Sequence, residues 1–541
     1  MPELRPFYDV IVVGAGTAGA VVAQTLARLL PNKSILVIES GPNLDPSLPV
    51  ALEPANSPNL FVAQSDSRRQ QPPQAFTRQS VPPLGEAQVP ANVARHFPNY
   101  VQGRGWGGSG AINGLVCQPG HPADYDRWAH EYGCTGWSWF DIAPTLTKLR
   151  SELFTSTPSM YLEADRALLA AHTELTAQRL HDRQGFHSQQ GWQGWQRSPD
   201  QQGPRGLGDS QGANGLLGSA WLRLEPATLS ILENRRKLLG LNASIHYSNL
   251  HSIFSVDVER ILTVGTAVHG VKFTDGREVE CNHMIVSTGA IGTPVLLQRS
   301  NIGRPGVGHN LHDHTSVSVT LDLAGTEDKP CPTNVILESN DCIQILPVSQ
   351  LPNQPNLGVW MASPFQAIHG RGRVSNQSDD TIIVQFDSFS DERDRAHLRN
   401  AARLLGELLK QLSTQILTQP LIQIDTQSHQ RKNGPSSTKV TASPLDPELG
   451  EKISVLSDEE LDTWVYDNQG SYHHAAGTCR MGAPSDPRSV VDQHCNVLGW
   501  SNISVIDASI FPDLPMANPY LPTVAVAKLA ATRLANRLAC R

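Results

Sequence analysis

Apolar residues gather most densely near the start of this chain, in two short runs. Residues 10–13 are all β-branched, and residues 34–38 form a second run that is almost wholly apolar. Runs without polar alternation are typical of strands buried on both faces of a parallel sheet. Between them, residues 20–30 carry good helix formers with apolar side chains at helical spacing. The pattern predicts a strand, a helix and a second parallel strand.

Later stretches show other periods. Residues 270–280 place two β-like runs on either side of an Asp-Gly turn, which predicts a hairpin, and residues 284–287 form the next apolar strand. Over residues 316–390 short β-like runs alternate with proline-rich turns, as in a mainly antiparallel sheet. Amphipathic spacing predicts helices over residues 396–412 and 524–538.

The first strand ends on glycines whose spacing has a physical meaning. Gly14 allows a tight turn, Gly16 lets a pyrophosphate approach the backbone, and Gly19 lets the helix pack closely on the strand. The phosphates would meet the unpaired N–H groups at the helix N-terminus. Glu39 ends the second strand, where a carboxylate can accept hydrogen bonds from ribose hydroxyls. The unit predicts a bound dinucleotide, and these residues leave open whether it is FAD or NAD.

Composition bounds the remaining possibilities. At 541 residues the chain is too long for one ordinary core, so we expect two domains, interleaved in sequence. A hydrophobic content of 39% and a net charge of −8 fit a globular protein and argue against a nucleic-acid partner. No apolar run is long enough to span a bilayer, and the first strand begins too early for a signal peptide, which predicts a cytoplasmic location.

Two features read as structural rather than chemical. Residues 41–100 are rich in Pro, Gln and Ser and predict a long, irregular excursion over the surface. The eight cysteines are scattered without a Cys-x-x-Cys pair, which favours reduced, buried thiols over a disulfide framework or a zinc site.

Five further segments carry unusual combinations of glycine, histidine, asparagine and proline. They are residues 103–113 (GRGWGGSGAIN), 289–297 (GAIGTPVLL), 306–314 (GVGHNLHDH), 474–482 (HAAGTCRMG) and 518–523 (NPYLPT). In this order they resemble the signatures of the glucose–methanol–choline (GMC) family of FAD-dependent oxidoreductases. The resemblance extends from the first strand to the last helix.

The resemblance implies a two-domain α/β fold with FAD as the cofactor. A Rossmann-like FAD-binding domain would comprise residues 1–165, 213–314 and 466–541, and a Gln/Gly-rich connecting loop would occupy residues 166–212. The substrate-binding domain, residues 315–465, would be built on a mainly antiparallel sheet with helices.

The same resemblance implies which residues hold FAD. Where some members carry a histidine bonded to the flavin, this chain has Ile112, so the cofactor would be non-covalent. The implied contacts lie in the two glycine segments, in one strand of the sheet and in the C-terminal motifs. They are Gly14, Gly16, Thr17, Ala18, Gly19, Glu39, Gly107, Gly108, Asn113, Gly114, Leu115, Val116, Val258 (to the adenine), Asp507, Ala508, Asn518, Pro519 and Thr523.

His474 is the residue expected to carry the chemistry. An alcohol donates hydride readily only when its hydroxyl proton begins to leave, which calls for a base such as a histidine near neutrality. By resemblance, His474 accepts that proton while the hydride passes to flavin N5, and Asn518 adds a hydrogen bond to the same oxygen. The implied substrate is a small alcohol, with a primary, uncharged aryl or alkyl alcohol favoured. Oxygen or a quinone-like compound would reoxidise the flavin.

Other residues admit a functional and a structural interpretation. His473 is interpreted as a packed histidine. Residues 309–314 contain three histidines and an aspartate that could mimic a metal site, but the matching family segment is structural, so no metal is expected. Trp360 and Phe365 could face the substrate, although aromatic residues at such spacing are more often core.

An alternative function uses the same scaffold without redox chemistry. Hydroxynitrile lyases and certain cyclases of secondary metabolism share the family's architecture and keep the flavin without net electron transfer. A third alternative is a degenerate family member that binds FAD only as a structural element. All three hypotheses require FAD, so the behaviour of the flavin with substrate has to separate them.

Overall fold

The computed structural model describes the chain in several ranges. They are residues 4–41, 75–76, 102–184, 222–229, 231–232, 235–236, 247–323, 333–349, 357–377, 382–418, 442–444 and 446–540. Most of the surface excursion expected over 41–100 and most of the Gln/Gly-rich stretch that ends at residue 212 lie outside these ranges.

The N-terminal half of the fold is organised on a sheet that combines parallel and antiparallel pairs. Its order is β10-β11-β12-β1-β2-β9, and β22 also pairs with β12. β1, β2, β9, β12 and β22 are joined by parallel pairs, whereas the β10–β11–β12 part is antiparallel and contains the expected Asp-Gly hairpin. The strands are β1 (Phe7–Val13), β2 (Ile35–Ile38), β9 (Leu250–Ile253), β10 (Val258–Val264), β11 (Ala267–Phe273), β12 (Glu278–Val286) and β22 (Ile503–Val505).

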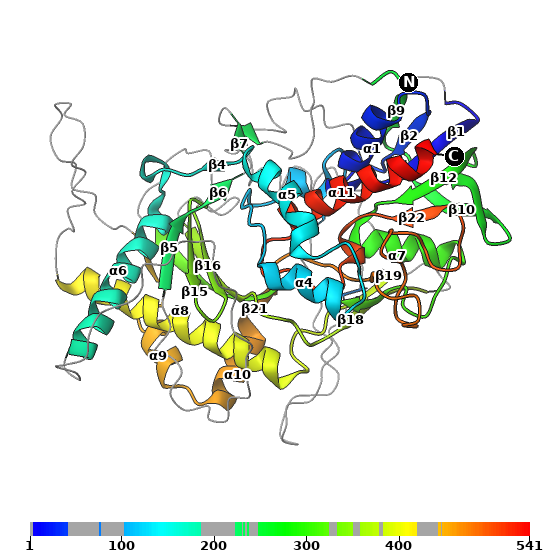
Figure 1. Cartoon of the computed structure of the whole chain (residues 1–541). Helices are drawn as coiled ribbons and strands as arrows, with labels where there is room; N and C mark the ends of the chain where they lie inside the picture. Colours follow the sequence, from blue (N-terminus) through cyan, green and yellow to red (C-terminus); the bar gives the residue numbers. More distant parts are fainter. Residues whose placement is uncertain are drawn as a thin grey trace, which may run out of the picture.

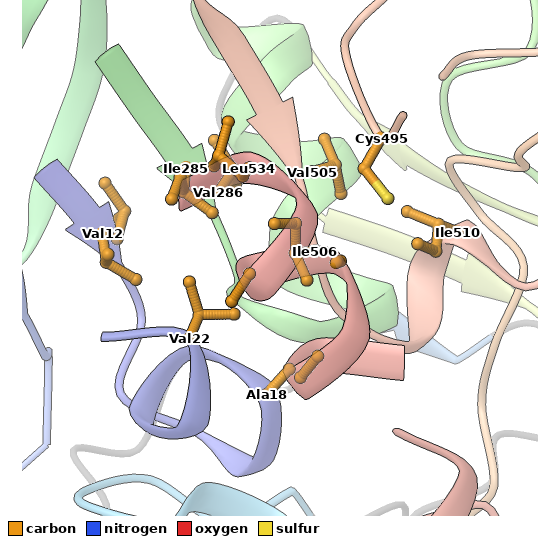
Figure 2. Packing of buried hydrophobic residues seen from close by; sticks show 14 of the residues in the cluster. Val12, Ala18, Val22, Ile285, Val286, Cys495, Val505, Ile506, Ile510 and Leu534 are labelled. Atoms are coloured by element: carbon orange, nitrogen blue, oxygen red, sulfur yellow. The ribbon is translucent and has the colours of Figure 1, made fainter. Parts of the chain in front are cut away.

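Helices from both ends of the chain cover this sheet. α1 (Thr17–Leu29) and α11 (Tyr520–Ala539) lie side by side although they are almost the whole chain apart (Figure 1). Figure 2 shows their meeting point with the strands, where Val12 of β1, Val22 of α1 and Leu534 of α11 point into one apolar cluster. The further helices here are α4 (Pro122–His130), α5 (Trp139–Arg150) and α7 (Gly289–Arg299).

The second large sheet is antiparallel in every described pairing. Its order is β20-β14-β17-β16-β15-β5, with β21 added to β14. The strands are β5 (Leu222–Pro226), β14 (Thr315–Leu323), β15 (Val335–Ser339), β16 (Ile343–Val348), β17 (Leu357–Pro364), β20 (Ala442–Pro444) and β21 (Gln469–Ser471). Helices α6 (Glu163–Gln184), α8 (Glu392–Thr418), α9 (Leu449–Val455) and α10 (Asp458–Asn468) accompany it, and Figure 1 shows α6 and α8 beside the sheet. The mainly antiparallel second sheet is thus confirmed.

The two faces of this sheet have different neighbours because side chains alternate along a strand. Trp360 and Ala362 of β17 belong to the apolar cluster shared with α6 and α8. Met361, between them, packs on a separate cluster that also contains Leu115 and Val116 from the N-terminal half. One face is therefore covered by helices, and the other meets the FAD-binding part of the chain.

Two boundaries of the expected organisation are wrong. Residues 163–184 form helix α6, whereas a connecting loop was expected from residue 166. Ala164, Leu168 and Ala171 lie at helical spacing and are buried against the second sheet, which stabilises the helix in spite of the polar residues that follow. Strand β5 was expected in the FAD-binding domain, but it pairs with β15 in the antiparallel sheet.

Short elements complete the fold and bring the two sheets together. The strands are β3 (Ala75–Phe76), β4 (Phe154–Thr155), β6 (Thr228–Leu229), β7 (Ile231–Leu232), β8 (Arg235–Arg236), β13 (His309–Leu311), β18 (Gly372–Asn376) and β19 (Ile382–Gln385), and the 3₁₀ turns are η2 (Gly108–Ala111), η3 (Pro158–Met160) and η5 (Ala508–Ile510). Thr315 of β14 pairs with Ser471 of β21, and His312 forms a β-bridge with Ala476. These pairings set residues 471–476 beside residues 312–315. Among the described helices, none is long and apolar enough to cross a membrane.

Candidate active site

The first glycine turn is a close junction of β1, β12 and α1. Gly14 has a φ of +96°, and a Cβ on it would lie 2.4 Å from the carbonyl oxygen of Ser287. Gly19 follows Ala18 in the buried first turn of α1, and its Cβ would lie 1.9 Å from the carbonyl oxygen of Gly14. Gly16 is the N-cap of α1 and provides no side-chain cap. The helix N-terminus is therefore suited to bind a pyrophosphate through its N–H groups.

The second glycine segment lies directly on this turn. The Gly107 N–H donates to the Ala15 carbonyl at 2.8 Å, and the Thr17 hydroxyl donates to the Gly107 carbonyl at 3.3 Å. Gly107 and Gly108 have φ of +87° and +51°, and a Cβ on Gly108 would lie 2.7 Å from Cα of Gly16. Only glycine allows the two backbones to lie this close. Residues 14–19 and 107–108 therefore form one backbone cradle, which fits a dinucleotide.

Glu39 ends β2 inside the cradle and is engaged by backbone. Its Oε2 accepts the Ala15 N–H at 2.8 Å, and its Oε1 accepts the Gly41 N–H at 2.8 Å and the Gly105 N–H at 3.1 Å. The side chain is buried at 6% exposure. The Glu39 carboxylate therefore holds the segments of the cradle together, a role that the sequence did not suggest. The ribose contact expected from the sequence would come in addition to this role.

Val258 is the first residue of β10, and the residues just before it contact the end of β2. The Val256 N–H donates to the Glu39 carbonyl at 3.2 Å, and the Ser255 N–H donates to the Gly41 carbonyl at 2.8 Å. These bonds bring the chain just before Val258 to the end of β2. The contact of Val258 with the adenine stays a prediction.

Asp507 lies between β22 and η5, and its carboxylate faces the N-terminus of α7. Its Oδ2 accepts the Gly289 N–H at 2.8 Å and the Thr293 hydroxyl at 2.6 Å. Burial raises the pKa of Asp507, against these hydrogen bonds. The Ala508 carbonyl accepts the Gly477 N–H at 3.1 Å, which joins this turn to the segment that follows His474. Asp507 and Ala508 together thus join residues 289–297 to residues 474–482.

The residues after η2 lead from the cradle to the second sheet. Oδ1 of Asn113 accepts the Leu115 N–H at 3.1 Å, and Leu115 has a φ of +68°. Gly114 borders open space, because a Cβ on it would meet nothing within 4 Å. Leu115 and Val116 are buried in the apolar cluster on the face of the second sheet that the helices do not cover. Its buried members are Leu115, Val116, Ala227, Leu229, Ile336, Leu346, Phe365 and Tyr472.

His474 and Asn518 come together from different parts of the fold. His474 follows β21 on a loop, and Asn518 directly precedes Pro519, the N-cap of α11. Asn518 Nδ2 lies 3.5 Å from Nε2 of His474. Asn518 is 8% exposed, and its Oδ1 is buried without a hydrogen-bond partner in the described structure. Thr523, further along α11, donates its N–H to the Pro519 carbonyl at 2.8 Å.

Three rings surround His474. His314 places its Nδ1 2.9 Å from Nδ1 of His474 and stacks on Phe365 with centroids 4.1 Å apart. Tyr472 packs edge-on against His474 with centroids 4.9 Å apart. Because an Nδ1–Nδ1 contact of this length can hold a single proton, the two imidazoles fix each other's tautomers.

Burial keeps these imidazoles neutral. It lowers the pKa of His474 well below the usual range, with smaller contributions from His314 and His473. It lowers the pKa of His314 to about 3. His474 is therefore an unprotonated imidazole across the physiological range, as a base requires.

His314 is the neighbour of His474 that sequence reasoning did not assign, whereas Phe365 had been considered for the substrate side. His314 was included among residues 309–314, for which a structural role was expected, yet it contacts His474 directly. Phe365 lies beside His474, whereas Trp360 is fully buried and donates its indole N–H to the Ala164 carbonyl at 3.1 Å. The core interpretation is confirmed for Trp360, whereas Phe365 is buried in an apolar cluster and also contacts His474.

The other histidines have separate environments. His312 is buried and its Nδ1 contacts the Asn310 carbonyl at 2.7 Å, while His309 is exposed. His473 is exposed rather than packed, with a φ of +62°. Within the described ranges, no three His, Cys, Asp or Glu side chains form a ligand set for a metal ion.

Fold and site together define the class of protein. GMC oxidoreductase models match residues 8–205 and 239–316 for the N-terminal domain and residues 369–527 for the C-terminal domain. The chain belongs to the GMC oxidoreductase family, whose members oxidise CH–OH groups, and its cofactor is FAD.

Individual relatives are distant but match over the full length. The oxygen-dependent choline dehydrogenase of Vibrio vulnificus is 27% identical, over 99% of this chain and 95% of its own. The 5-(hydroxymethyl)furfural oxidase of Methylovorus is 28% identical, over 96% of this chain and 97% of its own. The crystal structure of pyridoxine 4-oxidase from Mesorbium loti is 21% identical and covers 97% of this chain and 98% of its own, with a TM-score of 0.69.

Proposed function

We propose that this chain oxidises a primary, uncharged aryl or alkyl alcohol to the aldehyde, with His474 as the base. The observation that carries the proposal is the pairing of a neutral, half-buried imidazole with the amide of Asn518 at 3.5 Å. FAD, when bound, supplies the acceptor of the substrate's hydride.

The cradle described above supports the predicted set of FAD contacts. The uncapped N-terminus of α1, with Gly14, Gly16, Thr17, Ala18 and Gly19, would hold the pyrophosphate together with Gly107 and Gly108. Glu39 and Val258 would hold the adenosine end. Residues that follow the cradle toward the second sheet or lie in the C-terminal turns would hold the remainder. They are Asn113, Gly114, Leu115, Val116, Asp507, Ala508, Asn518, Pro519 and Thr523. Ile112 supports non-covalent attachment.

The hydrogen bonds around His474 indicate which nitrogen acts. If Nδ1–H of His474 donates to Nδ1 of His314, then Nε2 carries the lone pair and faces Asn518. Nε2 is then placed to take the alcohol proton, while an amide hydrogen of Asn518 holds the alcohol oxygen. His314 would act as the acceptor that keeps His474 in this tautomer.

An apolar, aromatic wall supports an uncharged substrate. Phe365 and Tyr472 contact His474, and Met361 from the second sheet packs on the apolar cluster to which both aromatic rings belong. Both oxygens of Asp313, the buried carboxylate beside His474, accept hydrogen bonds from the loop of His474 itself. The relatives named for choline, hydroxymethylfurfural and pyridoxine all act on alcohols, and choline differs by its charge.

A single experiment tests the reaction class. The FAD-loaded protein is mixed anaerobically with benzyl alcohol, hexanol, hydroxymethylfurfural, pyridoxine and choline, and the flavin absorbance is followed. We expect bleaching by the neutral alcohols and loss of bleaching in His474→Ala with FAD retained. A flavin that stays oxidised while product forms would instead support the lyase or cyclase alternative. Readmission of oxygen, or of a quinone, then identifies the electron acceptor.

A further inference from the structure

Asp313 binds the loop that carries His474 through both of its carboxylate oxygens. Oδ1 accepts the N–H of His474 at 2.8 Å, and Oδ2 accepts the hydroxyl of Ser471. Oγ of Ser471 in turn accepts the N–H of His473 at 2.9 Å. One buried carboxylate, 7% exposed, therefore fixes three residues of the loop.

The loop needs this support because its backbone is strained. His473 has a φ of +62°, a left-handed conformation that L-residues rarely adopt and that persists only when the surroundings enforce it. His473 directly precedes His474, so a relaxation of this residue would turn the imidazole of His474 away from Asn518. The bonds from Ser471 and Asp313 oppose that relaxation.

Behind the loop, Asp313 borders two small cavities. Neither is fully enclosed, and both have Asp313, Thr315 and Ser388 in their walls. Ser471 lines the first, and the second includes Gln366, whose Oε1 is buried without a hydrogen-bond partner in the described structure. Because neither cavity is closed, solvent can reach the Asp313 carboxyl group from the side opposite the loop.

We propose that Asp313 is a positioning residue for His474, and that its carboxyl group exchanges its proton with water in these two cavities. In the ionised form both oxygens accept, and charge-assisted hydrogen bonds hold the loop. When a water-borne proton binds, one oxygen becomes a donor, the Ser471 hydroxyl has to turn away, and the loop loosens. The rate of alcohol oxidation therefore follows the ionisation of Asp313, a consequence that rests on the proposed function.

Burial lowers the pKa values of the histidines around Asp313 well below neutrality. Burial raises the pKa of Asp313 to about 7, against hydrogen bonds from Ser471, His474 and His314. On the loop side, burial lowers the pKa of His314 to about 3 and that of His474 further. The remaining groups on elements packed around it are His312, with a pKa lowered to about 3, His397, lowered to about 4, Asp394, raised by burial, and Asp387.

The variant Asp313→Asn separates this role from simple support. The amide keeps an acceptor for the His474 N–H but presents a donor to Ser471, which mimics the protonated acid. We expect flavin reduction in the wild type to rise with pH through about 7. The variant should stay at the low-pH rate throughout, about tenfold slower than the wild type at about pH 8. A variant that keeps the rise near neutrality would overturn the proposal.

Two further variants sharpen the test. Ser471→Ala removes a hydrogen bond that favours the charged carboxylate, so the rise should move to higher pH. Asp394→Asn is the matched control, because this buried carboxyl borders the second cavity but accepts hydrogen bonds only from His369 and Gly370. The rate of flavin reduction in Asp394→Asn should depend on pH as it does in the wild type. Loss of the rise near pH 7 in this variant would contradict the proposal that Asp313 is the titrating group.

A readout without substrate keeps the inference independent of the proposed reaction. The folded-state pKa of Asp313 is raised above its unfolded value, so the wild type is most favoured relative to Asp313→Asn at low pH. The difference in melting temperature, wild type minus variant, should fall between about pH 4 and pH 7 and then level. A flat difference would refute titration of Asp313, whereas the expected slope without any flavin bleaching would leave it standing and remove only the proposed function.

Discussion

Replacing Glu39 by Gln changes one atom of a carboxylate that three backbone N–H groups share. Ala15 donates to Oε2, and Gly41 and Gly105 donate to Oε1. A glutamine has one acceptor oxygen, which we expect to face Gly41 and Gly105. Its NH₂ group then faces the N–H of Ala15, a residue at 0% exposure that water cannot reach.

The magnitude follows from these contacts. A buried N–H left without an acceptor costs about 1–3 kcal/mol, and each of the other two bonds loses about 1 kcal/mol with the negative charge. The sum is about 4 kcal/mol. Since the bonds lie within the protein, we expect most of this loss in the free energy of unfolding of the FAD-free chain. FAD should also bind at least about tenfold more weakly, because the cradle is no longer held in shape.

Urea unfolding of the FAD-free protein, followed by FAD titration with flavin fluorescence, measures both quantities. Glu278→Gln is the matched control, since Glu278 is exposed on β12 and should change stability by less than about 0.5 kcal/mol. Equal midpoints for the two variants would refute the backbone role of Glu39. Weaker FAD binding without a change in unfolding would restrict Glu39 to the ribose contact.

Three other substitutions test further parts of the structure. Gly14→Ala should lower the free energy of unfolding by about 3 kcal/mol or more, because its Cβ would lie 2.4 Å from a carbonyl oxygen at a φ of +96°. Gly303→Ala is the control, since a Cβ there would meet open space and should not lower the free energy of unfolding. Thermal unfolding compares the two variants. His314→Phe keeps the stacking on Phe365 but removes the acceptor for His474, so stopped-flow flavin reduction should slow about tenfold or more. Trp360→Ala should lower the unfolding free energy by about 3–5 kcal/mol. Its folded fraction should reduce flavin at the wild-type rate, and a slower rate would return Trp360 to the substrate site.

The elements that local sequence could predict are those with strong, short-range signals. The β-branched run at residues 10–13 and the glycines after it specify β1, the turn and α1 without help from distant residues. Helix α6 was missed because glutamine and glycine dominate from residue 181 on, and this composition was extended back over a stretch with helical spacing. Its stability comes from packing against α8, a contact that local composition does not show.

The site divides in the same way. His474 and Asn518 were identified by the family motifs, and the structure adds the distance between them. The role of His314 could not be read from its own segment, since its contact with His474 spans 160 residues and depends on the pairing of β14 with β21. Side chains alternate along β17, so Trp360 packs on the helices while Met361 packs on the cluster that contains Phe365 and Tyr472.

The attachment of the two proposed catalytic side chains has a consequence for protein engineering. The loop of His474 continues from β21, a strand of the antiparallel sheet, whereas Asn518 stands at the start of α11 on the nucleotide-binding side. A chimaera that takes its antiparallel sheet from a relative with another substrate would replace the support of His474 and keep that of Asn518. Such a graft should fold and turn yellow with FAD yet turn over slowly, until substitutions in β14 or β21 bring the two side chains back to their native separation.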